Sequence, residues 1–185
     1  MSKLFEKIVR PALFGLDAET AHEFGIKVLE TGLDSAPAQR LARSRYLFDF
    51  PWEVERFGLK FQNPIGIAAG FDKNGRVVNQ LASLGFGFVE VGTVTLRPQA
   101  GNEKPRMFRL PQDEALINRL GFNNEGAQAV AERLARLDRR CVVGVNIGKN
   151  KDVPNEEAVE NYLAAFDVVH PVADYIAVNI SSPNT

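Results

Sequence analysis

The sequence lacks most of the features that mark secreted, membrane-spanning or nucleic-acid-binding proteins. Its 185 residues contain one cysteine, so a disulfide framework is excluded and a reducing compartment is favoured. No apolar run approaches the roughly 18 residues of a membrane-spanning helix, and Glu6, Lys7 and Arg10 interrupt any signal-peptide core. The formal net charge of −1 gives no argument for nucleic-acid binding, which requires a basic surface. These absences favour a cytoplasmic or membrane-surface protein.

Two phosphate-binding motifs are also missing. The sequence contains neither GxGxxG nor GxxxxGK(S/T), so neither a Rossmann dinucleotide site nor a P-loop is expected. The composition, 45% hydrophobic and 24% charged, is that of an ordinary soluble globular protein. Function therefore has to be sought in the order of the predicted elements and in the residues at their ends.

The first 45 residues show helical periodicity. Apolar residues recur at helical spacing in the first helix, at Leu4, Phe5, Ile8, Val9, Ala12 and Leu13. Asp17 is the expected N-cap of a second helix, which Gly32 ends. Its predicted apolar face carries Ala21, Phe24, Val28 and Leu29. A third helix is expected after Asp34, with Pro37 near its first turn. Pattern alone favours a helical decoration packed on the main domain, and the alternative is a lid that meets a membrane surface or a lipid-like ligand.

From residue 54 the period changes to that of strands and α/β units. Residues 54–61 alternate like a hairpin, with Gly58 near the turn. Four apolar runs then predict buried strands at 65–69, 86–91, 142–147 and 175–180. Helices are expected between them at 75–84, 125–137 and 156–169. Repeating βα units without antiparallel signals predict a parallel α/β sheet or barrel.

One connection of this predicted sheet is unusually long. It runs from about Thr95 to Asn124 and contains a predicted small hairpin, residues 107–110 paired with 115–118. Long ordered loops after strands are more often functional than idle.

The residues that follow the four strands are small or neutral-polar, with two lysines. They are residues 69–75, Gly92 and Thr93, residues 146–149, and Asn179 onward. Glycine lets a flat ligand approach the backbone, and asparagine and threonine supply both donors and acceptors. Such a set suits a flavin or a pyrimidine better than a metal, because metal sites use histidine, cysteine or clustered carboxylates. No metal site is therefore expected.

Topology narrows the choice of an acid–base group. Cys141 and His170 precede strands, so both should lie on the opposite, N-terminal face of the sheet, and His22 lies apart in the helical segment. Lys73, Ser182 and the neutral amides remain. Serine is a poor base in water and needs a water-excluded, activating site. On composition alone, Ser182 is more often a loop-capping serine than a catalyst.

Six segments carry a resemblance to a known family. They are NPIGIAAGFDKNG at 63–75, VEVGTVT at 89–95, PRMFRL at 105–110, INRLGFNN at 117–124, NIGKN at 146–150 and NISSPNT at 179–185. Each alone is unspecific, but all six occur in order behind a helical extension. Together they resemble the class 2 dihydroorotate dehydrogenases, the quinone-linked flavoenzymes of pyrimidine biosynthesis. The match runs over the whole chain.

The resemblance implies an α/β fold, a TIM (β/α)8 barrel. This chain would supply about its first four βα units, preceded by a small N-terminal helical domain. Residues 1–45 would form a membrane and quinone-tunnel domain, and residues 46–185 the first half of the FMN-binding barrel. TIM barrels typically run to about 250 residues. We therefore expect a cleaved protein, a fragment or a chain completed by a partner, and we expect the 185 residues alone to be inactive or nearly so.

The resemblance also assigns roles at the strand ends. The residues that match FMN-holding positions are Ala69, Gly70, Phe71, Asp72, Lys73, Thr93, Asn146 and Asn179. Those that match positions around dihydroorotate or orotate are Lys73, Asn118, Arg119, Leu120, Gly121, Phe122, Asn179 and Asn184. Ser182 matches the base that removes the C5 proton while C6 passes hydride to flavin N5. Class 1 relatives carry cysteine there, so the serine marks the class. Lys73 would stabilise the substrate carboxylate or the charge of reduced flavin.

The implied function is oxidation of dihydroorotate to orotate on the way to UMP, with hydride passing to FMN and electrons then to a quinone. His22 and Arg109 match polar residues at the inner end of the family's quinone tunnel. The resemblance further implies a peripheral membrane protein whose N-terminal helices contact the cytoplasmic face of the bacterial inner membrane. Two alternatives remain. One is an inactive fragment that only binds a membrane or a partner, and the other is a different TIM-barrel flavin oxidoreductase that acts on a dihydropyrimidine.

Overall fold

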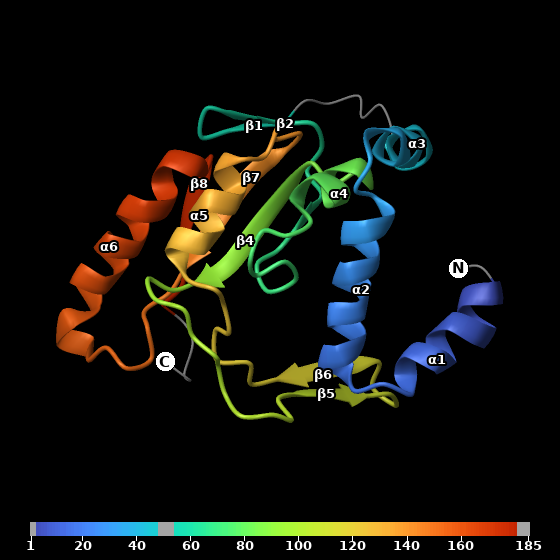
Figure 1. Cartoon of the computed structure of the whole chain (residues 1–185), viewed down its shortest axis with the longest axis horizontal. Coiled ribbons are helices and arrows are strands. Elements are labelled where there is room, and N and C mark those ends of the chain that lie inside the picture. The colour runs from blue at the N-terminus through green and yellow to red at the C-terminus, as the bar shows by residue number, and fades with distance from the viewer. Residues whose placement is uncertain (1–2, 48–53, 181–185) are drawn as a thin grey trace.

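The computed structural model describes residues 3–47 and 54–180. Its centre is a four-stranded parallel sheet in the order β3-β4-β7-β8 (Figure 1). The strands are β3 (Gly66–Ile67), β4 (Phe88–Val94), β7 (Val142–Ile147) and β8 (Tyr175–Val178). The spatial order of these four strands is the same as their order in the sequence, as it is in a βα barrel. The predicted parallel α/β architecture is confirmed.

Three helices connect these strands and cover one face of the sheet. They are α4 (Val78–Ser83), α5 (Ala127–Ala135) and α6 (Ala158–Val169), with short 3-10 turns η2 (Asn155–Glu157) and η3 (His170–Val172) on either side of α6. The core lies between helices and sheet. Its fully buried side chains include Val77, Leu81, Val89, Val91, Val130, Leu134, Val143, Val145 and Ile147. Alternate strand residues, such as Glu90 and Asn146, therefore point to the other face of the sheet.

The N-terminal segment is helical, as predicted. It comprises η1 (Phe5–Val9), a π-helical turn, and the helices α1 (Arg10–Phe14), α2 (Ala18–Gly32) and α3 (Ala36–Tyr46). The predicted cap of α2 is confirmed, because Asp17 Oδ1 accepts a hydrogen bond from the Thr20 amide at 2.9 Å. α3 begins after Asp34, as predicted, and its N-cap is Ser35, whose hydroxyl accepts from the Ala38 amide. Among the described residues, no helix is long and apolar enough to cross a membrane.

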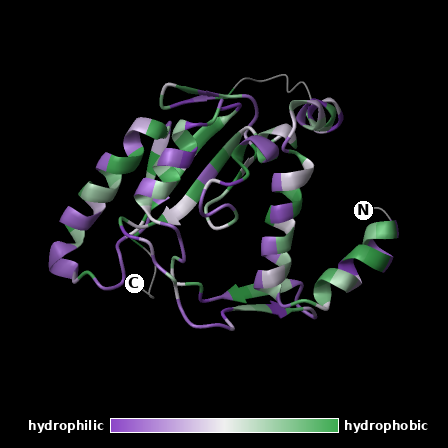
Figure 2. Cartoon of the chain, in the orientation of Figure 1, coloured by the Kyte–Doolittle hydropathy of each residue, from purple (hydrophilic) through white to green (hydrophobic). Residues whose placement is uncertain are grey.

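The predicted apolar face of α2 is wrong in part. Ile26, only 3% exposed, packs into the core, whereas Phe24 and Val28 are 55% and 50% exposed. The reason is geometric: Phe24 lies about 200° around a helix from Ile26, so the two cannot face the same neighbour. The helix carries two apolar stripes and buries one. Hydrophobic residues also lie along α1, away from the core of the sheet (Figure 2).

Both predicted hairpins are present. β1 (Val54–Arg56) and β2 (Leu59–Phe61) are joined by a two-residue turn in which Phe57 and Gly58 both have positive φ, 54° and 75°. This is the pattern of a tight hairpin turn. β5 (Met107–Leu110) pairs with β6 (Ala115–Asn118) within the long connection, at the predicted boundaries.

Element ends differ from the predictions in ways that shape the site. β3 has two residues rather than five, because the chain turns away at Gly70, whose amide donates to the Gly92 carbonyl at 2.7 Å. β4 continues to Val94 with an irregular register beyond Val91. α4 begins at Val78 rather than at residue 75, since the intervening residues form a turn capped by a carboxylate. The division into domains at residue 45 stays a prediction.

Candidate functional site

A cavity of about 600 Å³ opens at the carboxyl ends of the parallel strands. It is lined by Ala68, Ala69, Gly70, Lys73, Glu90, Thr93, Met107, Asn118, Leu120, Gly121, Phe122, Asn146 and Asn179. Parallel strands bring their carboxyl ends to one edge, so loops that are far apart in sequence meet there. Most residues assigned to FMN and to dihydroorotate by resemblance therefore share one cavity.

Five of the assigned residues lie elsewhere or outside the description. Phe71 and Asp72 belong to the same turn but line a smaller neighbouring cavity of about 40 Å³. Arg119 donates to the Pro105 carbonyl at 3.1 Å and lies over the Phe108 ring, so its side chain does not line the larger cavity. Ser182 and Asn184 lie outside the described residues.

Three of the predicted cofactor ligands form one hydrogen-bonded chain. The Asn179 amide donates to the Thr93 hydroxyl at 3.1 Å, and that hydroxyl donates to Asn146 Oδ1 at 2.7 Å. Asn146 Nδ2 then donates to Glu90 Oε1 at 3.0 Å. The sequence reasoning missed Glu90, although a carboxylate inside an apolar strand is itself a signal, because such groups are rarely buried without a partner.

Lys73 supplies the cavity with a cation. Its Nζ donates to Asn123 Oδ1 at 2.6 Å. Burial and, to a smaller extent, the nearby positive charge of Arg106 together lower the pKa of Lys73 to about 8. The ammonium is therefore still largely protonated at neutral pH and loses hydration in the cavity wall, which favours pairing with an anionic ligand group.

The turn that carries Lys73 is built around a buried carboxylate. Asp72 accepts from the amides of Arg76 at 2.8 Å and Val77 at 2.7 Å, and burial raises the pKa of its carboxyl group. The carboxylate thus points into the protein and shapes the turn. Gly70 has φ of 106°, and a Cβ there would meet nothing within 4 Å. The wall at Gly70 is bare backbone, which a flat ring could approach.

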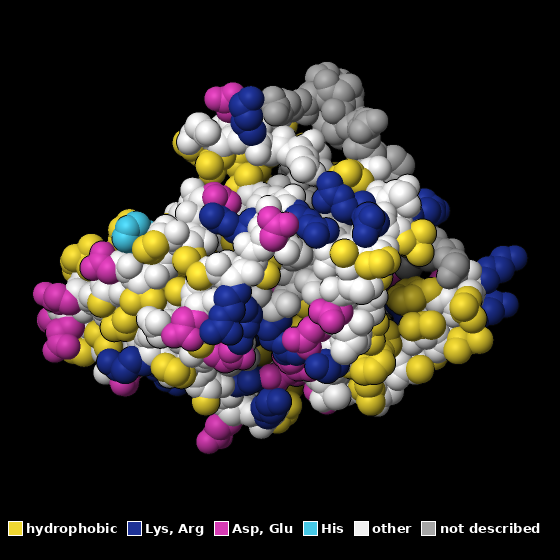
Figure 3. All heavy atoms as spheres, turned by 45° about the horizontal axis from the view of Figure 1, so that its top comes forward, with side chains coloured by type: hydrophobic (Ala, Val, Ile, Leu, Met, Phe, Trp, Pro, Cys, Tyr) yellow, Lys and Arg dark blue, Asp and Glu magenta, His cyan; other side chains and the backbone are white. Residues whose placement is uncertain are grey.

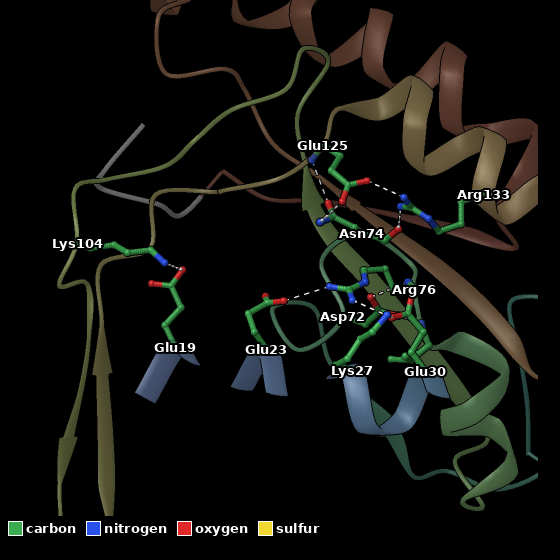
Figure 4. A network of polar contacts seen from close by, with 11 residues as sticks. Glu19, Glu23, Lys27, Glu30, Asp72, Asn74, Arg76, Lys104, Glu125 and Arg133 are labelled. Carbon is green, nitrogen blue, oxygen red and sulfur yellow. Dashed lines mark hydrogen bonds and ion pairs between the residues drawn. The ribbon is translucent and has the colours of Figure 1, made fainter. Parts of the chain in front are cut away.

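Ion pairs fix this turn from the side of α2 (Figure 4). The Arg76 guanidinium bridges Glu23 at 3.1 Å and Glu30 at 3.0 Å. Further along the helix, Glu19 pairs with Arg106 at 2.7 Å, and these side chains are only 12% and 8% exposed. Because Arg106 immediately precedes β5, α2 is tied both to the Lys73 turn and to the hairpin that lines the cavity.

A second set of contacts fixes the turn from the side of α5 (Figure 4). Asn74 and Glu125 bond to each other twice, through the Asn74 amide group at 3.3 Å and the Glu125 backbone amide at 3.0 Å. Arg133 donates to Glu125 at 2.6 Å and also to the Asn74 carbonyl. Lys73 is therefore held between two anchored neighbours.

The two residues assigned to the quinone tunnel line different cavities. The His22 ring meets the Phe71 ring edge-on at 5.1 Å, in the small cavity beside the Lys73 turn. Arg109 lines a separate cavity of about 400 Å³ between α1 and the β5–β6 hairpin. Its guanidinium donates to the carbonyls of Leu16 at 2.6 Å and Leu13 at 3.3 Å, so it holds the C-terminal end of α1.

The two residues that topology removed from the site lie at the other end of the sheet. Cys141 directly precedes β7, and burial raises the pKa of its thiol to about 11. His170 begins η3, ahead of β8, and stacks on the Phe166 ring at 4.9 Å. Within residues 3–47 and 54–180, no cluster of three or more histidine, cysteine or acidic residues could hold a metal ion.

The chain is similar to known proteins over nearly its whole length. It is 54% identical over 183 residues to a dihydroorotate dehydrogenase (quinone) of Stenotrophomonas maltophilia strain K279a, covering 96% of this chain and 50% of that protein. It is 57% identical over 180 residues to the protein of the same name from Roseiflexus sp. strain RS-1, with the same coverage. The chain thus spans about half the length of the curated relatives it matches.

Solved structures agree with the sequence comparison. A crystal structure of DHODH from Eimeria tenella in complex with ferulenol matches with a TM-score of 0.76 and 42% identity, covering 94% of this chain and 48% of that one. Together with the parallel sheet and its outer helices, this match implies a TIM barrel. The family model for dihydroorotate dehydrogenase matches residues 52–185. The chain belongs to the dihydroorotate dehydrogenase family.

Proposed function

We propose that the protein takes part in the oxidation of dihydroorotate to orotate in pyrimidine biosynthesis, with FMN as its flavin and a quinone as the electron acceptor. One observation carries the proposal: a lysine, a threonine and three asparagines from separate strand ends line one cavity. Membership of the family and the names of the quinone-linked relatives support it. The chain would contribute the first four βα units of the barrel, which fits its four consecutive parallel strands.

The residues present fit a flavin. The family is generally flavin-dependent, and the bound flavin supplies the acceptor for hydride. Ala69 and Gly70 would lie against the ring, since the wall there carries no side chain beyond a methyl group. Thr93, Asn146 and Asn179 would meet its polar edge, where donors and acceptors alternate. Tyr162 holds the Asn179 backbone in place by donating to its carbonyl at 2.8 Å.

The substrate half of the cavity combines a cation with amides and apolar groups. Lys73 would bind the carboxylate of dihydroorotate, and Asn118 would bond to the ring. Ser182 would act as the base at C5. Ser182 lies outside the described residues. The assignment is supported by its position in the sequence, three residues after Asn179, which follows β8 and lines the cavity.

The N-terminal helices would guide the quinone and contact the membrane. Apolar side chains exposed on η1, α1, α2 and the α1–α2 link are Leu4, Phe5, Ile8, Val9, Phe14, Leu16, Phe24 and Val28, and hydrophobic groups gather on this side of the molecule (Figure 3). A peripheral contact with the cytoplasmic face of the bacterial inner membrane fits such a surface. His22 and Arg109 would be the polar groups at the inner end of the quinone path, because His22 touches the Lys73 turn and Arg109 fixes α1.

The substrate assay tests this proposal directly. In the full-length protein, dihydroorotate should reduce the bound flavin and a quinone should reoxidise it, whereas a dihydropyrimidine oxidoreductase would prefer NAD(P)H. In the full-length enzyme, Ser182→Ala should keep FMN bound but slow flavin reduction by roughly 10²- to 10⁴-fold, as loss of a general base does. Single-turnover reduction at the wild-type rate would refute the role of Ser182.

A second variant separates the two half-reactions. His22→Ala should slow reoxidation by quinone and leave flavin reduction by dihydroorotate unchanged, because His22 lies beside the turn and does not line the larger cavity. Stopped-flow absorbance of the flavin measures both steps. A defect confined to the dihydroorotate step would contradict the tunnel role.

A further inference from the structure

Glu90 lies on the inner face of β4, where it lines the cavity. Both of its carboxylate oxygens accept a hydrogen bond from a neutral donor. Oε1 accepts from Asn146 Nδ2 at 3.0 Å, and Oε2 accepts from the Tyr175 hydroxyl at 3.0 Å. A carboxylate in such a position requires partners, because a buried acceptor without them costs free energy.

The strand register shows that this arrangement is built into the sheet. Glu90 on β4 lies opposite Gly144 on β7, and Gly144 lies opposite Tyr175 on β8. A Cβ at Gly144 would come within 2.1 Å of the Tyr175 ring. Any other residue at 144 would therefore block the path by which Tyr175 crosses beneath β7 to reach Glu90.

The donors and acceptors around Asn146 determine the orientation of its side-chain amide, that is, which neighbour faces the NH₂ group and which faces the oxygen. A carboxylate accepts hydrogen bonds and does not donate them, so Asn146 has to present its NH₂ group to Glu90. Its Oδ1 consequently faces Thr93 and takes the hydroxyl proton at 2.7 Å. The Thr93 oxygen is left to accept from the Asn179 amide at 3.1 Å. Every bond in this chain runs in one direction, toward Glu90.

We propose that Glu90 is a positioning residue that fixes the amide orientation of Asn146 and, through Thr93, that of Asn179. The orientation determines whether a ligand in the cavity meets an amide donor or a carbonyl acceptor at each position. A ring with alternating donors and acceptors on its edge, such as a flavin, binds one arrangement better than the flipped one. The identity of this ligand rests on the function proposed above, whereas the orientation of the amides does not.

Three variants of the intact protein test the role of Glu90. Glu90→Leu keeps similar bulk and removes the acceptor, so FMN should bind on the order of tenfold more weakly. Glu90→Gln should restore affinity to within about twofold of wild type, because one oxygen still accepts from Asn146 while the Tyr175 hydroxyl turns to accept from the new amide. Tyr175→Phe is the matched control, since it removes the other bond to Glu90 and leaves the acceptor for Asn146 in place.

Affinity is measured by flavin fluorescence during titration of the ligand-free protein with FMN. A second measurement needs no cofactor: hydrogen exchange of side-chain amides, followed by NMR. The Asn146 NH₂ group should exchange slowly in the wild type and in Glu90→Gln, and fast in Glu90→Leu. Wild-type exchange at Asn146 as fast as at the exposed Asn155 would overturn the proposal even if Glu90→Leu did not fold.

The outcomes separate the two proposals. If the wild type takes up no FMN, the proposed function fails, and the exchange rates still decide the role of Glu90. If FMN binds but Glu90→Leu, folded and with normal urea unfolding, retains wild-type affinity, the positioning role is refuted. An equal loss of FMN affinity in Tyr175→Phe and Glu90→Leu would also refute it, since the loss would then come from the missing Tyr175–Glu90 hydrogen bond and not from the orientation of Asn146.

Discussion

Replacing Lys73 by methionine should stabilise the ligand-free protein. The ammonium is partly buried, and burial lowers its pKa from 10.5 to about 8. A fall of this size corresponds to about 3 kcal/mol of unfavourable free energy while the lysine is charged in both the folded and the unfolded chain. Partial exposure reduces this penalty, and loss of the bond to Asn123 costs about 1 kcal/mol. We expect Lys73→Met to gain about 1–2 kcal/mol at pH 7.

The gain should depend on pH in a defined direction. Below pH 8 Lys73 is charged in both states and the full penalty acts on the wild type. Between about pH 8 and the unfolded value of 10.5, the folded protein has lost the proton that the unfolded chain still binds, so wild-type stability rises relative to the variant. Above that range the advantage of Lys73→Met should be gone. Urea unfolding followed by circular dichroism between pH 7 and 10 measures the difference.

Lys151→Met is a matched control. Lys151 also donates to an asparagine oxygen, Asn102 Oδ1 at 3.1 Å, but it lies exposed on the surface. Its substitution should change stability by less than about 0.5 kcal/mol at every pH. A difference between wild type and Lys73→Met that stays constant across the pH range would refute the reasoning. Lys73→Met should at the same time weaken the binding of an anionic ligand, because the variant removes the cation from the cavity.

Three further predictions concern the scaffold. Arg106→Gln should destabilise the protein by about 1.5–3 kcal/mol in urea, because it removes a charged hydrogen bond and leaves Glu19, only 12% exposed, with Lys104 at 3.4 Å as its remaining cation; a double-mutant cycle with Glu19→Gln that shows no coupling would contradict this. Gly144→Val should cost about 1–3 kcal/mol by overpacking against Tyr175, and a wild-type melting temperature would count against the crossing described above. Gly25→Ala should raise stability by about 0.5–1 kcal/mol, since a Cβ at this helical position meets nothing within 4 Å, and unchanged urea unfolding would refute it.

Elements whose signals are local were predictable from the sequence. β7 spans Val142–Ile147 as predicted, since four of its six residues are β-branched and the run is too short to show a competing helical pattern. The β5–β6 hairpin also has the predicted bounds, Met107–Leu110 and Ala115–Asn118. The meeting of the strand ends followed from topology, because parallel strands bring their carboxyl ends to one edge whatever the sequence of the loops.

Elements that depend on tertiary contacts were not predictable in detail. The start of α4 is delayed because the Asp72 carboxylate caps the preceding turn and takes the amides of Arg76 and Val77. A pattern of residues does not reveal which backbone amides a side chain will bind. For α2, two apolar stripes satisfy the same periodicity, and only the position of the sheet decides that Ile26 is buried and Phe24 is exposed.

The same distinction applies to the site. Gly70, Thr93, Asn146 and Asn179 lie at the cavity because the strand ends bring their backbones there. The direction of the Arg119 side chain depends instead on its neighbours, and the carbonyl of Pro105 draws the guanidinium away from the cavity. The sequence pattern therefore predicts where the backbone of a site residue lies. The direction of its side chain depends on contacts with residues from distant segments, which the pattern does not reveal.

The cavity is positioned before any ligand binds. Lys73 lies in a turn that α2 holds through Arg76, while α5 holds it through Glu125. In the cavity wall, Glu90 aligns the amides that the strands bring together. Ordering mobile groups on binding costs affinity, so a site whose groups are already fixed retains more of its interaction energy. The family resemblance assigned none of the residues Arg76, Glu125 and Glu90 to a ligand. They contribute to binding because they fix the positions of the residues that were assigned.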